Sequence, residues 1–517
     1  MNRKEMLAAI EENQIWDVVI IGGGASGAGI ALDSASRGYK TLLIERADFS
    51  SGTSSRSTKL VHGGVRYLQQ GNIALVLEAL KERGIMRKNA PHLVHDLPFI
   101  VPNYDWWEGP FYGIGMKIYD MLAGREGFGN SELLSLEETV KHIPTVEQEG
   151  LNGGVIYYDG QFDDARLVIN LIKTAAEQGG VAVNYMEAVS LTKTFDLVSG
   201  VEVRDLINDK EYNLKASVVI NATGPFTDSV RKMDCQDCLP MISPSQGVHM
   251  VLDKSFLPGD SAIMVPHTDD GRVLFAIPWH DKIVVGTTDT PITEAVREPI
   301  PLEEEVNFLL EHTARYLTKD PTREDILSVF AGVRPLVVNP EAENTAAISR
   351  EHVVSISKSG LVTIAGGKWT TYRKMAEDTL EQAIMIGQLE PEECKTKTLN
   401  IHGYHNHADA FGALECYGSD ALEIQGLAKT DAILAEKIIP EYDAIKAEVI
   451  WAVREEMAMT IEDFLSRRRR YLILDTRASL KMAPVVAGLM AKEMGKDAGW
   501  IEEQVAAYKK LAENYLV

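Results

Sequence analysis

Short apolar runs that end in glycine recur at three distant points of the chain. Residues 18–21 read Val-Val-Ile-Ile and lead into three glycines, residues 218–220 read Val-Val-Ile and lead to Gly224, and residues 361–365 lead into Gly366 and Gly367. Continuous apolar runs of this length, bounded by turn residues, are typical of buried strands in a parallel sheet. We therefore expect three separated segments to meet in one sheet, with other material inserted between them.

Other stretches have the hydrophobic spacing of helices or of antiparallel strands. Residues 72–89 predict an amphipathic helix ended by Pro91, and its apolar stripe comprises Ile73, Val76, Leu77, Leu80 and Ile85. Residues 272–289 predict two antiparallel strands joined by a polar turn at 280–282. From about residue 419 the apolar spacing becomes helical, and Thr460 is a candidate helix cap with Asp463 three positions later.

The first glycine turn has the spacing of a dinucleotide-binding site. In Gly22-x-Gly24-x-x-Gly27, the glycines allow a tight turn, a close approach of the backbone to a pyrophosphate and close packing of the next helix. Glu45 ends the following strand, where a carboxylate can accept hydrogen bonds from ribose hydroxyls. NAD and FAD share this opening, but the later glycine strands favour FAD, since an extended FAD is usually held by distant parts of a chain.

Composition narrows the class of protein. The chain has 517 residues, enough for two or three domains, and a formal net charge of -23 that disfavours a nucleic-acid partner. Its four cysteines and the lack of an apolar leader fit a reducing cytoplasm. The pair Cys235 and Cys238 has redox or zinc spacing, but no second pair or nearby histidine completes a metal site, so a surface loop is expected.

Two stretches could contact a membrane. No run reaches the roughly 20 apolar residues of a spanning helix, but residues 106–122 are aromatic and lightly charged, as in an interfacial segment. A helix packed on the substrate lobe is the alternative. The run Arg467 to Arg470 could touch anionic lipid or a partner, or it could be a solvated helix end.

Candidate chemistry gathers after the second predicted strand and near the third. Residues 50–68 follow that strand along the expected cofactor and supply His62, Arg66 and Tyr67. Further cations, which suggest a bound anion in this acidic chain, are Arg334, Arg350 and Lys368. His249 begins a strand of the inserted lobe, where it is either a proton acceptor or a structural histidine.

Seven segments taken together point to one family. Besides the first glycine motif, they are residues 58–68, 163–166, 221–225, 286–289, 332–335 and 366–373. In this combination they closely resemble the FAD-dependent glycerol-3-phosphate dehydrogenases. The resemblance covers about residues 16–390, and residues 464–475 resemble the family's C-terminal domain, which often has Thr where Arg469 stands.

The resemblance implies an α/β FAD-binding domain, Rossmann-like and of the glutathione-reductase/D-amino-acid-oxidase type, with an inserted antiparallel-sheet substrate lobe and a C-terminal helical domain. We expect residues 1–70, 150–240 and 330–395 to form the FAD-binding domain, 71–149 and 241–329 the substrate or roof lobe, and 396–517 the helical domain. The expected reaction is oxidation of sn-glycerol 3-phosphate at C2 to dihydroxyacetone phosphate, with hydride transfer to flavin N5.

Site residues follow from the same resemblance. Arg66, Tyr67 and Lys368 would hold the phosphate or substrate oxygens, and Arg334 and His249 would lie by the reacting carbon with Arg350 nearby. Either Arg334 or His249 could take the hydroxyl proton; an arginine is a poor base and is better suited to stabilise an alkoxide. The residues expected to bind FAD are Gly22, Gly24, Ala25, Ser26, Gly27, Glu45, Arg46, Thr53, Ser54, Ser57, Lys59, His62, Gly63, Gly64, Gly224, Gly367, Lys368, Trp369 and Thr370.

Partners also follow from the family. FAD is expected to bind noncovalently, without a metal, and the electrons would pass to a membrane quinone, which implies a peripheral position on the cytoplasmic membrane face; a homodimer is compatible with this. The alternatives are an amino-acid oxidase of the same fold, which would need a carboxylate clamp, and a flavoprotein that binds FAD without catalysis.

Overall fold

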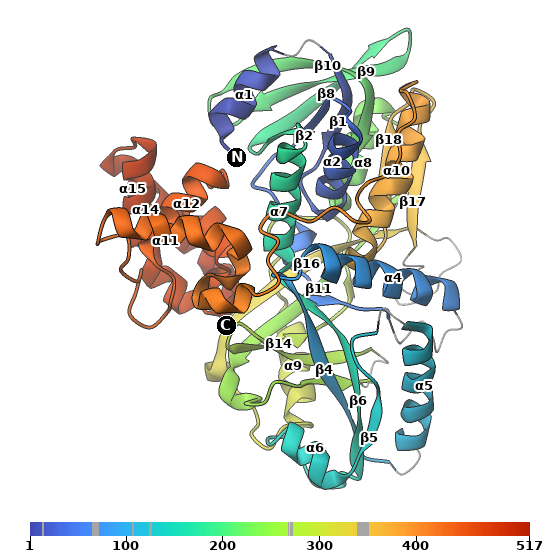
Figure 1. The fold of residues 1–517 in the computed structure, drawn as a ribbon, viewed down its shortest axis with the longest axis vertical. Helices are drawn as coiled ribbons and strands as arrows, with labels where there is room; N and C mark the ends of the chain where they lie inside the picture. Colours follow the sequence, from blue (N-terminus) through green and yellow to red (C-terminus); the bar gives the residue numbers. More distant parts are fainter. Residues whose placement is uncertain are drawn as a thin grey trace.

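Two β-sheets and a helical C-terminal domain make up the protein, seen here in a computed structural model (Figure 1). The structure describes residues 1–12, 15–64, 72–105, 108–123, 127–266, 268, 272–338 and 351–517. Figure 1 shows the two sheets as successive halves of an elongated body, with the orange and red C-terminal helices against one side.

The first sheet joins the three apolar runs that the sequence singled out. Strands β1 and β10 are parallel, and β10 is in turn parallel to β18, so segments hundreds of residues apart lie side by side as predicted. Val18, Val19 and Ile20 of β1 are fully buried, which explains their uninterrupted apolar sequence. Within the described residues the strands of this sheet are β1 (Trp16–Ile21), β2 (Thr41–Ile44), β7 (Val181–Val183), β8 (Met186–Thr194), β9 (Leu197–Asp205), β10 (Lys210–Asn221), β17 (His352–Ile356) and β18 (Val362–Gly366).

Helices cover this sheet where the small residues of its central helix allow close packing. Helix α2 (Ala25–Arg37) packs between α7 (Asp164–Glu177) and α10 (Tyr372–Ile386), as Figure 1 shows. A Cβ at Gly29 would lie 2.9 Å from the Tyr372 ring, so α2 and α10 touch closely at this point. The other helices near the sheet are α1 (Arg3–Glu12) and α8 (Thr227–Asp234).

The second sheet is the inserted, mainly antiparallel lobe. Strand β11 pairs with both β14 and β16, and β13 and β14 form the hairpin predicted over residues 272–289. The strands of this sheet are β3 (Leu60–Val61), β4 (Val94–Asn103), β5 (Glu132–Leu134), β6 (Gly153–Phe162), β11 (Ile242–Asp253), β12 (Ala262–Val265), β13 (Leu274–Trp279), β14 (Lys282–Gly286), β15 (Thr290–Pro291) and β16 (Ile326–Val337).

The limits of the two lobes remain a prediction. Hydrogen bonding places β6 and most of β16 in the second sheet, although the sequence division puts residues 150–240 and 330–395 in the first. Strand β3, within the predicted segment 1–70, also pairs with β6. The chain therefore crosses between the sheets more often than its apolar runs suggest.

Helices of the second lobe include α4 (Ile73–Asn89), α5 (Glu108–Ala123), α6 (Leu136–His142) and α9 (Glu303–Ala314). Helix α4 forms as predicted and is capped by Asn72, but its expected apolar stripe is only partly buried. Val76 and Leu80 are buried, whereas Ile73 and Leu77 are 50% and 45% exposed. The predicted apolar stripe is therefore buried only in part, because no element among the described residues covers Ile73 and Leu77.

The C-terminal part is helical, as predicted. Thr460 and Asp463 form the expected reciprocal cap: Asp463 N donates to Thr460 Oγ1 (3.2 Å), and Thr460 N donates to Asp463 Oδ2 (3.0 Å). The helices of this domain are α11 (Ala421–Thr430), α12 (Lys446–Glu455), the short π-helical turn η9 (Asp463–Arg468), α13 (Tyr471–Leu474), α14 (Thr476–Met494) and α15 (Ala498–Ala512).

The lipid-facing and the solvated interpretations of the arginine run are wrong for three of its four arginines, and the fourth, Arg469, is half-buried. Arg467, Arg468 and Arg470 are 3%, 0% and 2% exposed, so they meet neither solvent nor lipid. Arg467 and Arg468 both donate to Asp48, at 2.5 Å each. These arginines bind carboxylates of the FAD-type lobe and fasten the helical domain to it.

Candidate active site

The turn between β1 and α2 is a glycine cradle that leaves no room for side chains. Gly22 has a φ of 115°, and a Cβ there would lie 2.5 Å from the Ala222 carbonyl oxygen. A Cβ at Gly27 would lie 1.9 Å from the Gly22 oxygen. The two positions therefore require glycine, and the N-terminus of α2 opens toward the strand ends, the arrangement that binds pyrophosphates.

Glu45 lies beside this cradle, directly after β2. Its carboxylate accepts hydrogen bonds from Gly23 N (2.6 Å) and Ala47 N (2.8 Å). Burial raises the pKa of Glu45, while these two amides oppose the rise. Each oxygen keeps a further lone pair, so the predicted contact with ribose hydroxyls remains a prediction that this geometry allows.

A cleft of about 570 Å³ runs along the carboxyl ends of the parallel strands. It is lined by glycines and small polar residues from all three predicted strand ends, which suits a long cofactor approached by backbone. The predicted cofactor residues that line it are Gly22, Gly24, Ala25, Ser26, Glu45, Arg46, Thr53, Ser54, Gly224, Gly367, Lys368 and Trp369.

The remaining predicted cofactor residues lie behind or beyond this cleft. Gly27 supports the cradle from behind, and the side chains of Ser57 and Lys59 turn away to bind Asp164. The chain then runs toward α5: His62 N donates to Thr370 Oγ1 (3.2 Å) and Gly63 N donates to the Tyr119 hydroxyl (2.8 Å). Gly64, with a φ of 78°, ends the described part of this segment.

Arg334 is held in place on β16 by the loop that follows β14. Its Nη2 donates to Thr287 Oγ1 (3.0 Å) and to the Thr288 carbonyl oxygen (2.9 Å), and its Nη1 lies 3.2 Å from Asp289 Oδ1. The guanidinium lies over Gly247, where a Cβ would come within 2.3 Å of Nη2. A fixed positive charge of this kind can stabilise a developing oxyanion without reorganisation.

His249 occupies the neighbouring strand β11, four residues from the partner of Arg334 in the sheet. The residue is 2% exposed, its ring stacks on Phe330 at 4.9 Å between centroids, and Thr58 Oγ1 lies 2.9 Å from Nε2. Burial above all, with the nearby charges of Lys59 and Arg334, holds the pKa of His249 well below its usual range. The imidazole is therefore neutral at physiological pH, and the bond with Thr58 is compatible with either tautomer because a hydroxyl can donate or accept.

The other predicted cations are only partly described. Lys368 follows β18 and lines the cleft, with its carbonyl oxygen accepting from Thr371 N (3.1 Å). Arg66, Tyr67 and Arg350 lie outside the described residues. Of the predicted cations, only Arg334 and Lys368 fall within the described residues, and the anion site itself stays a prediction.

Several residues of the cleft are not among those predicted from the sequence. Arg56 lines it and donates to Glu298 Oε2 (2.5 Å), which also lines it. Glu462 and Leu511 reach the cleft from the helical domain. No local sequence signal marks these residues, because their place in the cleft depends on contacts between distant parts of the chain.

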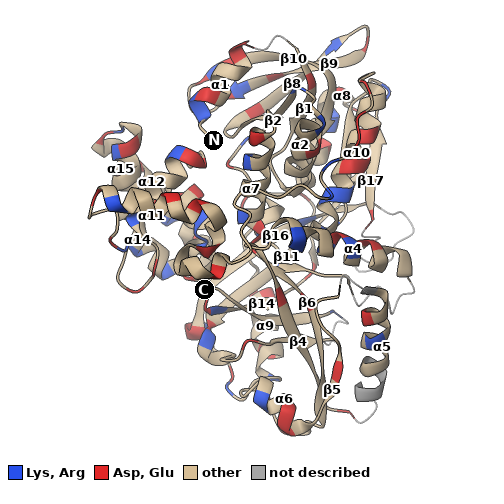
Figure 2. Ribbon diagram, viewed as in Figure 1, with Lys and Arg blue, Asp and Glu red and all other residues tan. Residues whose placement is uncertain are grey.

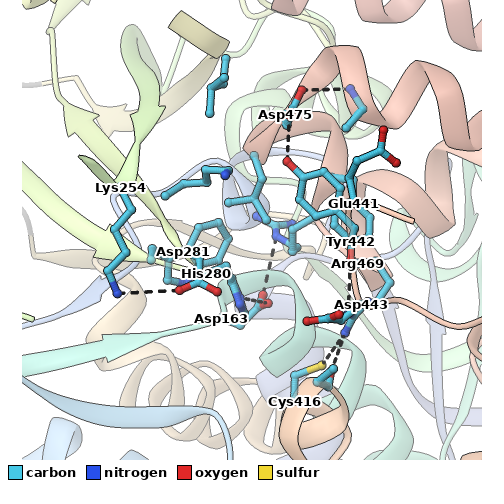
Figure 3. A pocket seen from close by; sticks show the side chains of 18 of the residues that line it. Asp163, Lys254, His280, Asp281, Cys416, Glu441, Tyr442, Asp443, Arg469 and Asp475 are labelled. Atoms are coloured by element: carbon cyan, nitrogen blue, oxygen red, sulfur yellow. Dashed lines mark hydrogen bonds and ion pairs between the residues drawn. The ribbon is translucent and has the colours of Figure 1, made fainter. Parts of the chain in front are cut away.

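A second and larger cavity, of about 900 Å³, lies between the β13–β14 hairpin and the helical domain. In Figure 3, Arg469 points toward Cys416 and His280 lies beside Asp163. Both acidic and basic side chains line this cavity, and neither Arg334 nor His249 is among its lining residues.

The cysteine pair forms no metal site among the residues that the structure describes. Cys235 is exposed, Cys238 is half-buried and both are free thiols. No group of three or more candidate ligands is found in the described ranges.

Comparison with known proteins decides the family. Residues 17–373 match the FAD dependent oxidoreductase family, and residues 361–501 match the C-terminal domain of alpha-glycerophosphate oxidase. The human "Glycerol-3-phosphate dehydrogenase, mitochondrial" is 41% identical over 98% of this chain and 75% of its own length. The chain belongs to the FAD-dependent glycerol-3-phosphate dehydrogenases.

Two solved structures are similar to this chain. The glycerol-3-phosphate dehydrogenase from Bacillus halodurans, complexed with FAD, is 30% identical, with a TM-score of 0.81 over 99% of this chain and 97% of that one. The L-alpha-glycerophosphate oxidase from Mycoplasma pneumoniae is 16% identical, with a TM-score of 0.57 over 75% of this chain and 98% of that one. The latter shows a shared fold only. The protein is thus an FAD-dependent dehydrogenase, and the glycine cradle and cleft fit that cofactor.

Proposed function

We propose that this dehydrogenase oxidises sn-glycerol 3-phosphate at C2 to dihydroxyacetone phosphate. Bound FAD supplies the hydride acceptor, at flavin N5. The observation that carries the proposal is the pairing of a fixed guanidinium, Arg334, with a buried neutral imidazole, His249, on adjacent strands of the second sheet. A hydroxyl that loses hydride from its carbon needs both a stabilised oxygen and a proton acceptor.

Arg334 is proposed to hold the C2 oxygen of the substrate. An arginine keeps its proton throughout the accessible pH range, so it serves as an electrostatic partner rather than as the base. Asp289 and Thr287 orient the guanidinium before substrate arrives. This preorganisation favours the negative charge that develops on the oxygen as hydride leaves.

His249 is proposed to take the hydroxyl proton. Its low pKa keeps the ring neutral, and Thr58 fixes its orientation through Nε2. Lys368, with Arg66 and Tyr67 outside the described residues, is proposed to hold the phosphate or other substrate oxygens, because charge-assisted hydrogen bonds suit a dianion. Arg350, also outside the described residues, is proposed to lie near the reacting carbon.

FAD is proposed to bind noncovalently along the cleft. The pyrophosphate would lie at Gly22–Gly24 and the N-terminus of α2, and the ribose near Glu45. No cysteine or histidine lines this cleft in the described part of the chain, which supports noncovalent binding.

We propose a membrane quinone as the electron acceptor and a peripheral position on the cytoplasmic membrane face. Helix α5 supports this: Ile114, Ile118 and Met121 are 64%, 40% and 74% exposed, while Met116 and Tyr119 are buried against the second lobe. In Figure 2 its described ribbon is largely tan, with only isolated charged residues. None of the described helices has the length and apolar content to cross a membrane. An exposed apolar face on a packed helix suits interfacial contact.

Anaerobic reduction of the purified flavoprotein tests the reaction. We expect sn-glycerol 3-phosphate to bleach the flavin absorption band, whereas glycerol and amino acids should leave the band unchanged. A quinone should then restore the band faster than oxygen does. Bleaching by an amino acid instead would favour the oxidase alternative. A flavin that no substrate bleaches would indicate a protein that only binds FAD.

A further inference from the structure

One buried carboxylate, Asp164, holds both neighbours of Thr58. Asp164 is 0% exposed and begins α7. Its Oδ2 accepts hydrogen bonds from Ser57 N (3.2 Å), Ser57 Oγ (2.7 Å) and Lys59 Nζ (2.7 Å). The residue between them, Thr58, is the one whose hydroxyl meets His249 Nε2. The position of Thr58 therefore depends on the bonds of Asp164.

The other oxygen of Asp164 binds the helical domain. Arg470 Nη2 donates to Asp164 Oδ1 (2.8 Å) and also to the Ser55 carbonyl oxygen (2.7 Å). Lys59 Nζ donates to the same Ser55 oxygen (2.7 Å). Arg470 and Asp164 are 306 residues apart in the chain, so this cluster joins two domains at the segment that carries Thr58.

Both cations of the cluster have unusual backbone conformations. Lys59 has a φ of 64° and Arg470 a φ of 63°, in the left-handed region that residues other than glycine rarely adopt. Such conformations persist where the surroundings hold them, and they concentrate at functional sites. The side chains of both residues bind the same carboxylate, Asp164.

Aromatic packing connects this cluster to His249. Lys59 Nζ lies 5.2 Å from the centroid of the Phe330 ring and 5.2 Å from that of Trp279. Phe330 in turn stacks on His249. His249 thus contacts one residue of the 57–59 segment through a hydrogen bond and is packed, through Phe330, against another.

We propose that Asp164 and Arg470 are positioning residues for His249, and that the helical domain completes the active site by fixing residues 57–59. Neither residue touches the reacting atoms; both act through Thr58 and Lys59. The inference rests on the proposed role of His249 as proton acceptor. It assigns the arginine run a task in the reaction beyond fastening two domains.

The test compares the FAD-loaded wild type with Arg470→Met and Arg470→Lys. The matched control is Lys173→Met, which removes another buried bond between α7 and the helical domain, to Asp420 (2.7 Å), but leaves residues 53–64 untouched. Two quantities are measured: amide hydrogen exchange of peptides spanning residues 53–64, and kcat and KM for flavin reduction by sn-glycerol 3-phosphate.

We expect Arg470→Met to speed exchange in residues 53–64 and to lower kcat by roughly tenfold to a hundredfold, the cost of small misplacements in active sites. KM should change little, and Arg470→Lys should recover part of kcat. Lys173→Met should leave both quantities near wild type. If Arg470→Met matched Lys173→Met in exchange and in kcat, the proposal would be overturned.

A second variant keeps the test decisive if Arg470→Met does not fold. Thr58→Val removes the hydroxyl that meets His249 but leaves the buried ion cluster, so kcat should fall while exchange of residues 53–64 stays near wild type. An unchanged kcat in Thr58→Val would contradict the proposed link. Failure of the wild type to be reduced by sn-glycerol 3-phosphate would refute the proposed reaction instead, and the exchange measurement would still report on the cluster.

Discussion

At the scale of single residues, the site is built from charges that the fold holds before substrate binds. Arg334 is bound by three consecutive residues, Thr287 to Asp289, and sits in space that Gly247 leaves open. His249 likewise fits beside Gly286, where a Cβ would lie 2.2 Å from its ring. Glycine at these two positions is thus a condition for placing both functional side chains on one sheet.

Replacing Arg334 by Ala should slow flavin reduction by about 10²–10³-fold, as the loss of one preorganised oxyanion donor does in other enzymes. FAD affinity should stay near wild type, since Arg334 is not among the residues that line the cofactor cleft. Anaerobic stopped-flow and FAD titration measure the two quantities. Arg323→Ala, which removes an exposed ion pair with Glu303, is the control. Reduction at the wild-type rate would remove Arg334 from the mechanism.

The pH dependence of flavin reduction should reflect the low pKa of His249. A base works in its neutral form, and burial lowers the pKa of His249 below the ordinary 6.5. The neutral form therefore persists as the pH falls through 6.5, and the rate of reduction should not fall there. Stopped-flow reduction between pH 5.5 and 8 checks this. A decline centred near pH 6.5 would indicate an ordinary, solvated histidine or a different base.

At the scale of elements, the local sequence predicts which strands and helices form, because their hydrophobic pattern and turn residues are local. The strands β1, β10 and β18 and the β13–β14 hairpin are recognisable because each is an apolar run with turn residues at its ends. Helix α4 is recognisable too, but the burial of each face is not. Ile73, for example, is exposed. Whether a residue of a helix is buried depends on which distant elements pack against it, and the periodicity of the helix does not reveal those elements.

Helix α5 offers a prediction at this scale. Replacing Ile114 and Met121 together by Glu should weaken binding to phospholipid vesicles roughly tenfold or more, because burying one such side chain contributes about 1.5–3 kcal/mol. Reduction of the flavin by substrate should be unaffected. Co-sedimentation with vesicles measures the binding.

The control for this prediction is Phe195→Glu. Phe195 is 96% exposed at the turn between β8 and β9, on the sheet at the opposite end of the molecule from α5 (Figure 1). Its replacement should leave vesicle binding unchanged. Equal loss in both variants would mean that α5 is not the contact surface.

At the scale of the whole molecule, the arginine run illustrates contacts that the sequence does not predict. A run of four cations ordinarily predicts a solvated or lipid-facing surface. Here the partners Asp48, Asp164 and Glu448 come from three separate parts of the chain and turn the run into a buried junction. The same holds for Glu462 and Leu511, which reach the cleft from the helical domain. Such contacts emerge only when the chain is folded.

The proposed reaction requires that hydride leaves C2 of sn-glycerol 3-phosphate for the bound flavin. The most direct test is anaerobic stopped-flow reduction with substrate deuterated at C2, beside unlabelled substrate and substrate deuterated at C1. We predict slower bleaching for the C2 label alone, with dihydroxyacetone phosphate as the product. Equal rates for all three substrates in a step shown to be chemistry, or a slower rate for the C1 label, would contradict hydride transfer from C2.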